Sequence, residues 1–284
     1  MTTRRGFTRY VAIGDSQTEG LGDGDDIRGH RGFADRLAEI LAAGDPGLLY
    51  ANLAVRGRLA DRVKAEQLAP ALALRPDLVT VMAGMNDLVR PGFDAARIAA
   101  DLEEMFAALT ASGATVVTVT FPDIGRIAPL ARRAVPRVLD LNARIREAAA
   151  RHGALVLDTF PQAATVDPRL WSQDRLHAAP LGHSRIASGM AHVLGVPGHA
   201  DWAAPLPDRP ARSVVRRAAT EVGWAANFLG PWAVRRIRGR SSGDGRTAKR
   251  SALTPVLPPP ALTPVLPPVR PLPASAHRRA RRAR

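Results

Sequence analysis

Three residues of this 284-residue sequence have the types and the spacing that nucleophilic catalysis requires. Ser16 ends the tripeptide Gly-Asp-Ser, which follows the short apolar run 10–13. A serine hydroxyl is a weak nucleophile that needs a base, and the base needs an orienting partner. Asp174 and His177 are three residues apart, so on one turn Asp174 can accept the Nδ1 proton and leave Nε2 to take the serine proton. Taken singly, the serine also fits a turn, and the Asp-x-x-His pair also fits a surface loop.

Two further segments offer hydrogen-bond donors for a negatively charged oxygen. Acyl transfer passes through a tetrahedral oxyanion, which donors aimed at it stabilise. Gly57 ends the segment NLAVRG, and a glycine lets its backbone N–H approach a ligand closely. Asn86 lies in the segment GMND, and its side-chain amide can donate. Each has a plainer interpretation, Gly57 as a turn glycine and Asn86 as a helix N-cap.

Apolar runs and helical patterns alternate along the first 195 residues. Short strands are predicted at 10–13, 48–55, 77–83, 114–121 and 154–157. Helical patterns separate them, and Pro180 opens a last helix. Strands that alternate with helices indicate a parallel sheet covered on both faces, with ligands at the carboxyl ends of its strands. Because the Ser, Gly and Asn segments follow strands and the Asp-x-x-His segment lies in the final loop, we expect all four at one edge.

Together and in this order, the four segments resemble the SGNH hydrolase superfamily, also called the GDSL esterase/lipase family. The serine block reads GDS at 14–16 and the glycine block NLAVRG at 52–57. The G-x-N-D block reads GMND at 84–87, and the D-x-x-H block reads DRLH at 174–177. The resemblance covers about residues 9–195. It departs from the family name at Gln17, where that name has Leu.

The resemblance implies an α/β fold, a three-layer α/β/α sandwich of flavodoxin-like shape, in which we expect a five-stranded parallel sheet. It implies Ser16 as nucleophile, His177 as general base and Asp174 as its orienter. The backbone N–H groups of Ser16 and Gly57, with the Asn86 side chain, would form the oxyanion hole. The resemblance implies no metal and no other cofactor. The implied substrates are small-molecule or lipid esters, hydrolysed through an acyl-enzyme.

Two other interpretations of the function are open. A carbohydrate O-deacetylase or a lysophospholipase would use the same site. A protein of another class would keep the fold in a catalytically idle form and bind anions through a basic tail, since a fold alone does not establish activity. The presence of all five candidate residues favours an enzyme.

The charge of the chain is divided unevenly. The formal net charge is +14, yet residues 1–200 carry 23 Lys and Arg against 22 Asp and Glu, whereas residues 201–284 carry 17 against 4. We predict a catalytic domain over 1–200, a basic and partly helical extension over 201–240, and a disordered Pro/Arg-rich tail over 241–284, which contains ALTPVLPP twice. The tail is a candidate for contact with an anionic surface, while nucleic acid is the less favoured partner.

Residues around these segments are expected to have plainer roles. Asp15 is expected to hold the serine loop through local hydrogen bonds, and His183 to be structural. The acidic run 23–26 is interpreted as a solvated loop, and Arg56 either as solvated surface or as a contact for anionic substrates. The chain has no cysteine, and its first apolar run is too short for a secretory signal, so we expect a cytoplasmic protein.

Overall fold

The computed structural model describes residues 6–208 and 242–257 of the chain. Its main sheet has the strand order β7-β6-β5-β1-β4-β8, in which every pair is parallel except β4 with β8. The parallel strands are β1 (Arg9–Gly14), β4 (Leu49–Asn52), β5 (Leu78–Met82), β6 (Thr115–Val119) and β7 (Leu155–Leu157). With β1 between β4 and β5, these five have the flavodoxin-like doubly wound order. The α/β fold expected from the sequence is confirmed.

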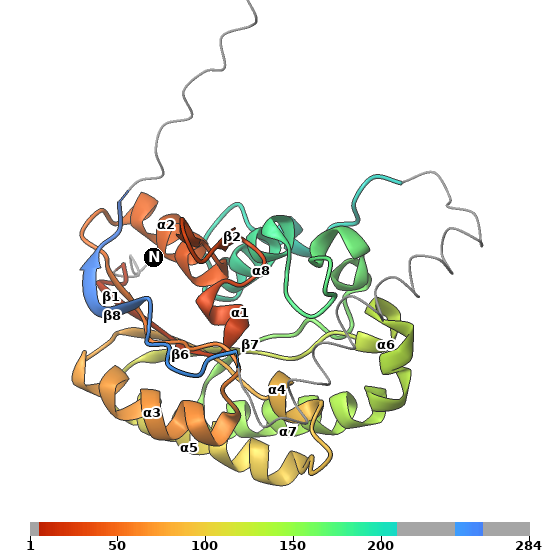
Figure 1. The fold of residues 1–284 in the computed structure, drawn as a ribbon. Coiled ribbons are helices and arrows are strands. Elements are labelled where there is room, and N and C mark those ends of the chain that lie inside the picture. Colours follow the sequence, from red (N-terminus) through yellow and green to blue (C-terminus); the bar gives the residue numbers. More distant parts are fainter. Residues whose placement is uncertain (1–5, 209–241, 258–284) are drawn as a thin grey trace, which may run out of the picture.

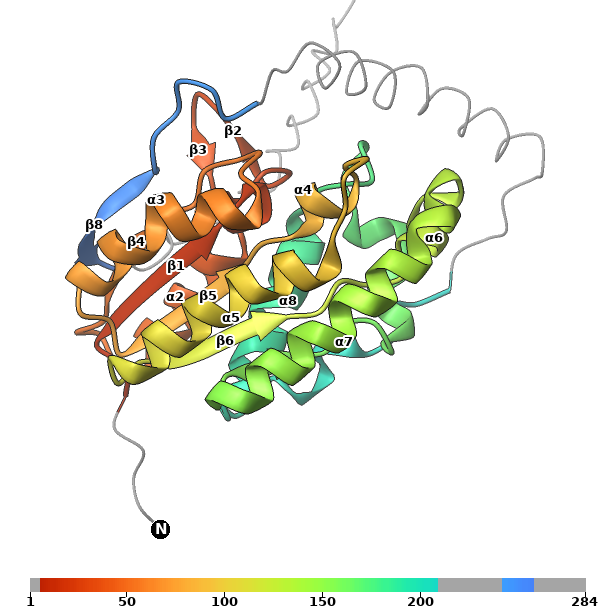
Figure 2. The same ribbon diagram turned by 90° about the horizontal axis from the view of Figure 1, so that it is seen from below.

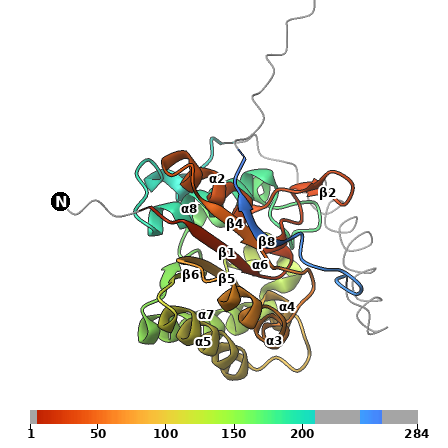
Figure 3. The same ribbon diagram turned by 90° about the vertical axis from the view of Figure 1, so that its left-hand side faces the viewer.

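Helices cover both faces of the sheet, so the strands are apolar on both sides. Helices α2 (Phe33–Gly44) and α8 (Pro180–Val193) pack on one face. Helices α3 (Ala60–Ala73), α5 (Ala95–Ala111) and α7 (Val135–His152) pack on the other (Figures 1 and 3). The strand β5 is buried at every position. The result is three layers, as expected.

Short elements follow the parallel strands at their carboxyl ends. Helix α1 (Ser16–Glu19) follows β1, α4 (Met85–Leu88) follows β5, and α6 (Ile124–Ile127) follows β6. A small hairpin, β2 (Gly24–Asp25) and β3 (Gly29–His30), comes after α1. Four 3-10 turns complete the described chain: η1 (Pro129–Ala134), η2 (Ala163–Val166), η3 (Pro168–Leu170) and η4 (Ala200–Ala203).

The sheet has six strands rather than the expected five. Strand β8 (Arg250–Pro255) comes from the predicted tail and pairs antiparallel with β4, beside which it runs in Figures 2 and 3. Its pairing includes Tyr50 with Thr254 and Asn52 with Arg250. The expectation of disorder from residue 241 onward is therefore wrong for 242–257. Proline is tolerated because β8 is an edge strand and Pro255 is its last residue.

Other predictions for the C-terminal part lie outside the described residues. These are the helical part of the extension within 209–241 and the second copy of the repeat with the terminal Arg cluster, within 258–284. None of the helices in the described ranges combines the length and apolarity needed to cross a bilayer.

Candidate active site

A chain of two hydrogen bonds joins the three residues that the sequence singled out for nucleophilic chemistry. The Nε2 atom of His177 lies 2.9 Å from Ser16 Oγ, and its Nδ1 atom lies 2.6 Å from Asp174 Oδ2. Burial by itself raises the pKa of Asp174, but hydrogen bonds from His177 outweigh it and hold that pKa well below its usual range. Asp174 is thus a carboxylate that can keep His177 Nδ1 protonated, which leaves Nε2 able to accept a proton from Ser16.

Ser16 is positioned by the way in which β1 leaves the sheet. Gly14 has a φ of +154°, and a Cβ there would lie 2.4 Å from both Met82 O and Thr18 Oγ1, so only glycine fits. The side chain of Gln67 on α3 accepts from Gly14 N at 2.8 Å and donates to Gly14 O at 2.9 Å. These bonds add to the sheet pairing of Gly14 with Met82 at the point where the chain turns into α1.

The Asp15 side chain supports the same turn, as expected. It caps α1 by accepting from Gln17 N at 3.2 Å and also accepts from Asn86 Nδ2 at 3.0 Å. Burial raises the pKa of Asp15 to about 7, with smaller opposing effects from these hydrogen bonds. Ionisation of the Asp15 carboxyl therefore costs free energy, which its hydrogen-bond donors partly offset.

The loop that carries His177 is held in two ways. Asp174 Oδ1 accepts from the backbone N–H of Leu176 at 2.9 Å and of His177 at 3.0 Å, which folds the loop around the carboxylate. Gln17 reaches across from α1: its Nε2 donates to Leu176 O at 3.1 Å, and its Oε1 accepts from Ala178 N at 3.1 Å. Gln17 therefore binds the backbone on both sides of the histidine from the residue next to Ser16.

The structure brings the predicted oxyanion donors to the same edge of the sheet. Gly57 lies in the turn after β4 with a φ of +77°, which favours glycine. Asn86 lies in α4, and its Nδ2 donates to Asp15 Oδ2 and, at 3.1 Å, to Arg58 O. The amide of Asn86 thus connects the loops after β1, β4 and β5.

Arg56 is not solvated surface, and its charge is paired with two carboxylates of this chain. Its side chain is 8% exposed and forms an ion pair with Glu19 of α1, in which Nε donates to Oε1 at 2.9 Å. Its backbone N–H donates to the other oxygen of Glu19 at 2.7 Å, and Nη2 donates to Asp26 at 2.8 Å. In the acidic run 23–26, which was interpreted as a solvated loop, residues 24–26 are exposed, although Asp26 binds Arg56. The interpretation is wrong only for Asp23, which is buried against Arg36.

His183 has the structural role that the sequence indicated. Its Nδ1 accepts from Phe33 N at 3.1 Å, and its Nε2 donates to Leu21 O at 2.9 Å. Only the neutral Nε2–H tautomer satisfies both partners. Burial lowers the pKa of His183 to about 4, so this tautomer persists at neutral pH.

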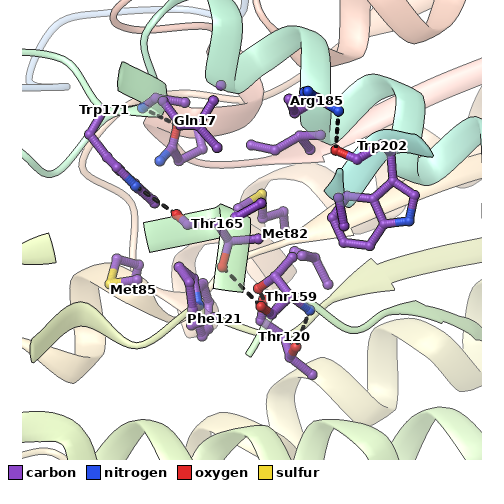
Figure 4. A pocket seen from close by; sticks show the side chains of 18 of the residues that line it. Gln17, Met82, Met85, Thr120, Phe121, Thr159, Thr165, Trp171, Arg185 and Trp202 are labelled. Atoms are coloured by element: carbon purple, nitrogen blue, oxygen red, sulfur yellow. Dashed lines mark hydrogen bonds between the residues drawn. The ribbon is translucent and has the colours of Figure 1, made fainter. Parts of the chain in front are cut away.

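A largely apolar pocket opens beside the serine. Asp15 and Gln17, on either side of Ser16, contribute to its wall. Figure 4 shows Gln17 and Trp171 toward one end and Trp202 with Arg185 toward the other. The apolar lining comes mainly from Met82, Met85, Val119, Phe121, Pro122, Leu170, Trp171, Ile186 and Trp202. The pocket lies over the carboxyl ends of β5 and β6, where an open α/β sheet binds its ligands.

Two positioning residues, Gln17 and Gln67, were missed by sequence reasoning. Both are buried and act on backbone groups far away in the chain, and no local pattern reports such contacts. One signal was present for Gln17, since it stands where the GDSL name has leucine. The pocket walls likewise combine segments from across the chain.

An open parallel sheet that carries a hydrogen-bonded Ser, His and Asp at its carboxyl edge is typical of serine-dependent hydrolases. Residues 12–185 match the GDSL-like Lipase/Acylhydrolase family. The chain belongs to this family and is a hydrolase of ester bonds. No curated protein matches it.

Several solved structures share the fold. LAE5, an α/β hydrolase enzyme from the metagenome of Lake Arreo in Spain, is 23% identical with a TM-score of 0.56, over 66% of this chain and 95% of LAE5. The psychrotrophic esterase EstA from Pseudoalteromonas sp. is 17% identical with a TM-score of 0.54, over 66% and 97%. Axe2, an acetylxylan esterase from Geobacillus stearothermophilus, is 20% identical with a TM-score of 0.56, over 71% and 97%.

Proposed function

We propose that the protein hydrolyses carboxylic esters through an acyl-enzyme formed on Ser16. The observation that carries this proposal is the position of His177, whose ring nitrogens lie 2.9 Å from Ser16 Oγ and 2.6 Å from Asp174 Oδ2. A base in hydrogen-bond contact with a hydroxyl, itself oriented by a carboxylate, is the arrangement that activates a serine. The solved Axe2 structures agree with these roles, since its catalytic mutants replace a serine, an aspartate and a histidine, the last two three residues apart.

The reaction has two halves. In the first, Ser16 Oγ attacks the ester carbonyl carbon while His177 Nε2 takes the hydroxyl proton, and the imidazolium then gives this proton to the departing alcohol. In the second, water attacks the acyl-serine, His177 takes a proton from the water, and the acid leaves as Ser16 regains its proton. Asp174 stabilises the imidazolium in both halves. The backbone N–H groups of Ser16 and Gly57 bind the oxyanion. The amide of Asn86 joins them by exchanging its hydrogen bond to Arg58 O for one to the negatively charged oxygen.

The labelling experiment for this proposal uses the full chain and a fluorophosphonate probe. The probe should label Ser16, as peptide mapping would show, and Ser16→Ala should abolish both labelling and turnover of p-nitrophenyl esters while the unfolding midpoint stays unchanged. EstA, which shares the fold, has been solved with monoethylphosphonate as inhibitor. Labelling of another residue, or turnover that survives Ser16→Ala, would contradict the proposal. A wild-type chain that neither reacts nor turns over esters would favour the catalytically idle, anion-binding alternative.

The pocket favours an apolar acyl group over acetate. Its wall is mostly Met, Phe, Trp, Leu, Ile and Val side chains, which contribute binding energy in proportion to the apolar area they cover. A carbohydrate O-deacetylase would leave most of this wall unused, whereas a lysophospholipase would use it. We therefore propose long-chain esters ahead of acetylated sugars as substrates.

A matched pair of alanines separates these substrate classes. Ala164 lines the pocket, while its neighbour Ala163 is exposed and does not. Ala164→Phe should raise KM for p-nitrophenyl octanoate by about tenfold, which corresponds to about 1.4 kcal/mol of lost apolar contact, and leave p-nitrophenyl acetate nearly unchanged. Ala163→Phe should change neither. An equal rise in KM for both esters in Ala164→Phe would show that this pocket does not bind the acyl group.

A further inference from the structure

We infer that the C-terminal segment 242–257 is a positioning element of the oxyanion hole, because it fixes the peptide bond between Arg56 and Gly57. This inference rests on the proposed function, in which the Gly57 N–H is an oxyanion donor. The segment lies outside residues 12–185, which match the family. It would therefore add to the catalytic machinery from a part of the chain that the family match does not include.

The first observation is the packing of Gly243. This residue is buried, and a Cβ on it would lie 2.0 Å from Arg56 O and 3.2 Å from Arg56 C. The carbonyl of Arg56 and the N–H of Gly57 belong to one peptide group, which is planar and trans, so they point in opposite directions. A backbone packed against the carbonyl therefore blocks rotation of the peptide group and keeps the N–H directed away from the segment.

The second observation is that Arg56 is held from the other side by the helix that carries the nucleophile. Glu19 of α1 accepts from the backbone N–H of Arg56 at 2.7 Å and from its Nε at 2.9 Å, and both side chains are almost fully buried. Ser16 and Glu19 are the first and last residues of α1. The two proposed backbone donors, those of Ser16 and Gly57, are thus tied to each other through one buried ion pair.

The third observation is that the segment reaches the same network. Arg246 Nη2 donates to Asp26 Oδ2 at 2.6 Å, and the other oxygen of Asp26 accepts from Arg56 Nη2 at 2.8 Å. Hydrogen bonds from Arg56, and then from His30, hold the pKa of Asp26 far below its usual range, so it is charged wherever the fold is intact. Asp26 therefore bridges an arginine of the segment to the arginine that precedes Gly57.

The segment has firm anchors beyond Arg246. Lys249 Nζ donates to Asp35 Oδ2 at 2.6 Å and to His30 O at 2.8 Å. Strand β8 then pairs with β4, and the guanidinium of Arg250 lies 5.1 Å from the centre of the Tyr50 ring. Strand β4 ends five residues before Gly57. The segment 242–257 therefore holds both ends of this stretch, since β8 pairs with β4 and Gly243 packs on the peptide group of Gly57 (Figure 1).

The test compares two glycines of the same turn in the full chain. Gly243→Ala forces the Arg56 carbonyl and the segment apart, so that one of them must move, whereas Gly245→Ala adds a methyl group that meets nothing within 4 Å. Gly245 has a φ of +72°, so its variant carries a backbone strain that Gly243→Ala does not share, which makes it a stringent control for stability. The measurements are kcat and KM for a short p-nitrophenyl ester, the Ki of a phenylboronic acid, and the unfolding midpoint.

Gly243→Ala should lower kcat by about tenfold to a hundredfold, because losing one oxyanion donor outright costs about 10² to 10³ in kcat. KM should stay within about twofold, and Ki for the boronic acid, which places an oxygen in the oxyanion hole, should rise in parallel with the fall in kcat. Gly245→Ala should leave kcat and Ki unchanged. Equal kcat in the two variants, or losses in Gly243→Ala that follow its unfolding midpoint alone, would overturn the inference.

A second pair of variants guards against a Gly243 variant that fails to fold. Arg246→Ala removes the link to Asp26, and Arg28→Ala removes a more exposed arginine that pairs with Asp25 in the same hairpin. Arg246→Ala should lower kcat several-fold with little change in KM, and Arg28→Ala should not. Equal kcat values in the two variants would contradict the proposed role of segment 242–257. Inactivity of the wild-type chain would instead defeat the proposed function, so the two failures are distinguishable.

Discussion

Replacing Gln17 with leucine tests whether the histidine is held in place from the nucleophile's own helix. Gln17 is 5% exposed, and its amide makes two hydrogen bonds of 3.1 Å, one to Leu176 O and one from Ala178 N. Gln17→Leu keeps a side chain of similar size, restores the residue of the GDSL name and removes both bonds. The backbone on either side of His177 then loses the two hydrogen bonds by which the Gln17 side chain ties it to α1.

The size of the effect follows from these two bonds. Each contributes about 1 kcal/mol net, and a buried backbone group left without a partner costs about 1–3 kcal/mol. The free energy of unfolding should therefore fall by about 2–4 kcal/mol. A displacement of about 1 Å in a catalytic group lowers the rate by about a hundredfold, so we expect kcat to fall between tenfold and a hundredfold, with a smaller change in KM.

The assay is ester turnover with kcat and KM measured separately, beside urea denaturation. Leu109→Ala serves as a control of comparable stability cost, about 2–5 kcal/mol, because Leu109 is fully buried in the last turn of α5, away from the edge that carries Ser16. It should lose stability and keep kcat. If Gln17→Leu keeps kcat while losing stability, as the control does, Gln17 is only part of the core and our reasoning about His177 is wrong.

Three further outcomes are expected. Asn86→Ala should lower kcat by about a hundredfold or more through loss of an oxyanion donor, with KM little changed, in the same steady-state assay. His183 has a pKa of about 4 in the folded chain against about 6.5 in the unfolded chain, so its contribution to stability is complete above pH 6.5 and falls by up to about 3 kcal/mol as the pH drops to 4. In urea denaturation, the stability of His183→Asn should depend less on pH than that of the wild type. An unchanged pH dependence would contradict this. Treatment with EDTA should leave ester turnover unchanged, and activity that a divalent metal restores would contradict the metal-free mechanism.

The candidate site could be located in the sequence because its signals are local. Ser16, Asn86 and the Asp174–His177 pair each lie in a short motif beside an apolar strand or in the last loop. The structure joins Ser16, His177 and Asp174 by hydrogen bonds, and Asn86 donates to Asp15, the residue before Ser16. Strand positions were also readable, although the run 48–55 was predicted too long, since β4 ends at Asn52.

Features that depend on distant partners were not readable. Arg56 is buried only because Glu19 and Asp26 come to it from another segment, so its charge suggested solvent. Strand β8 lies in the first copy of a proline-rich repeat, and its composition indicated an extended, unpaired chain. Its partner β4 lies about 200 residues earlier, a pairing that no local pattern reports.

Strand β8 also covers the edge of the sheet that β4 would otherwise expose. Without it, β4 would present a row of unpaired N–H and C=O groups, which is a template for pairing with another chain. The described chain closes this side with a short strand that ends in a proline and has Arg250 at its start. Proline and cationic side chains on an edge are means by which natural sheets resist edge-to-edge aggregation. Release of this one strand would therefore expose β4 as an open edge, and the same stretch from a neighbouring copy would be the best-matched sequence to cover it.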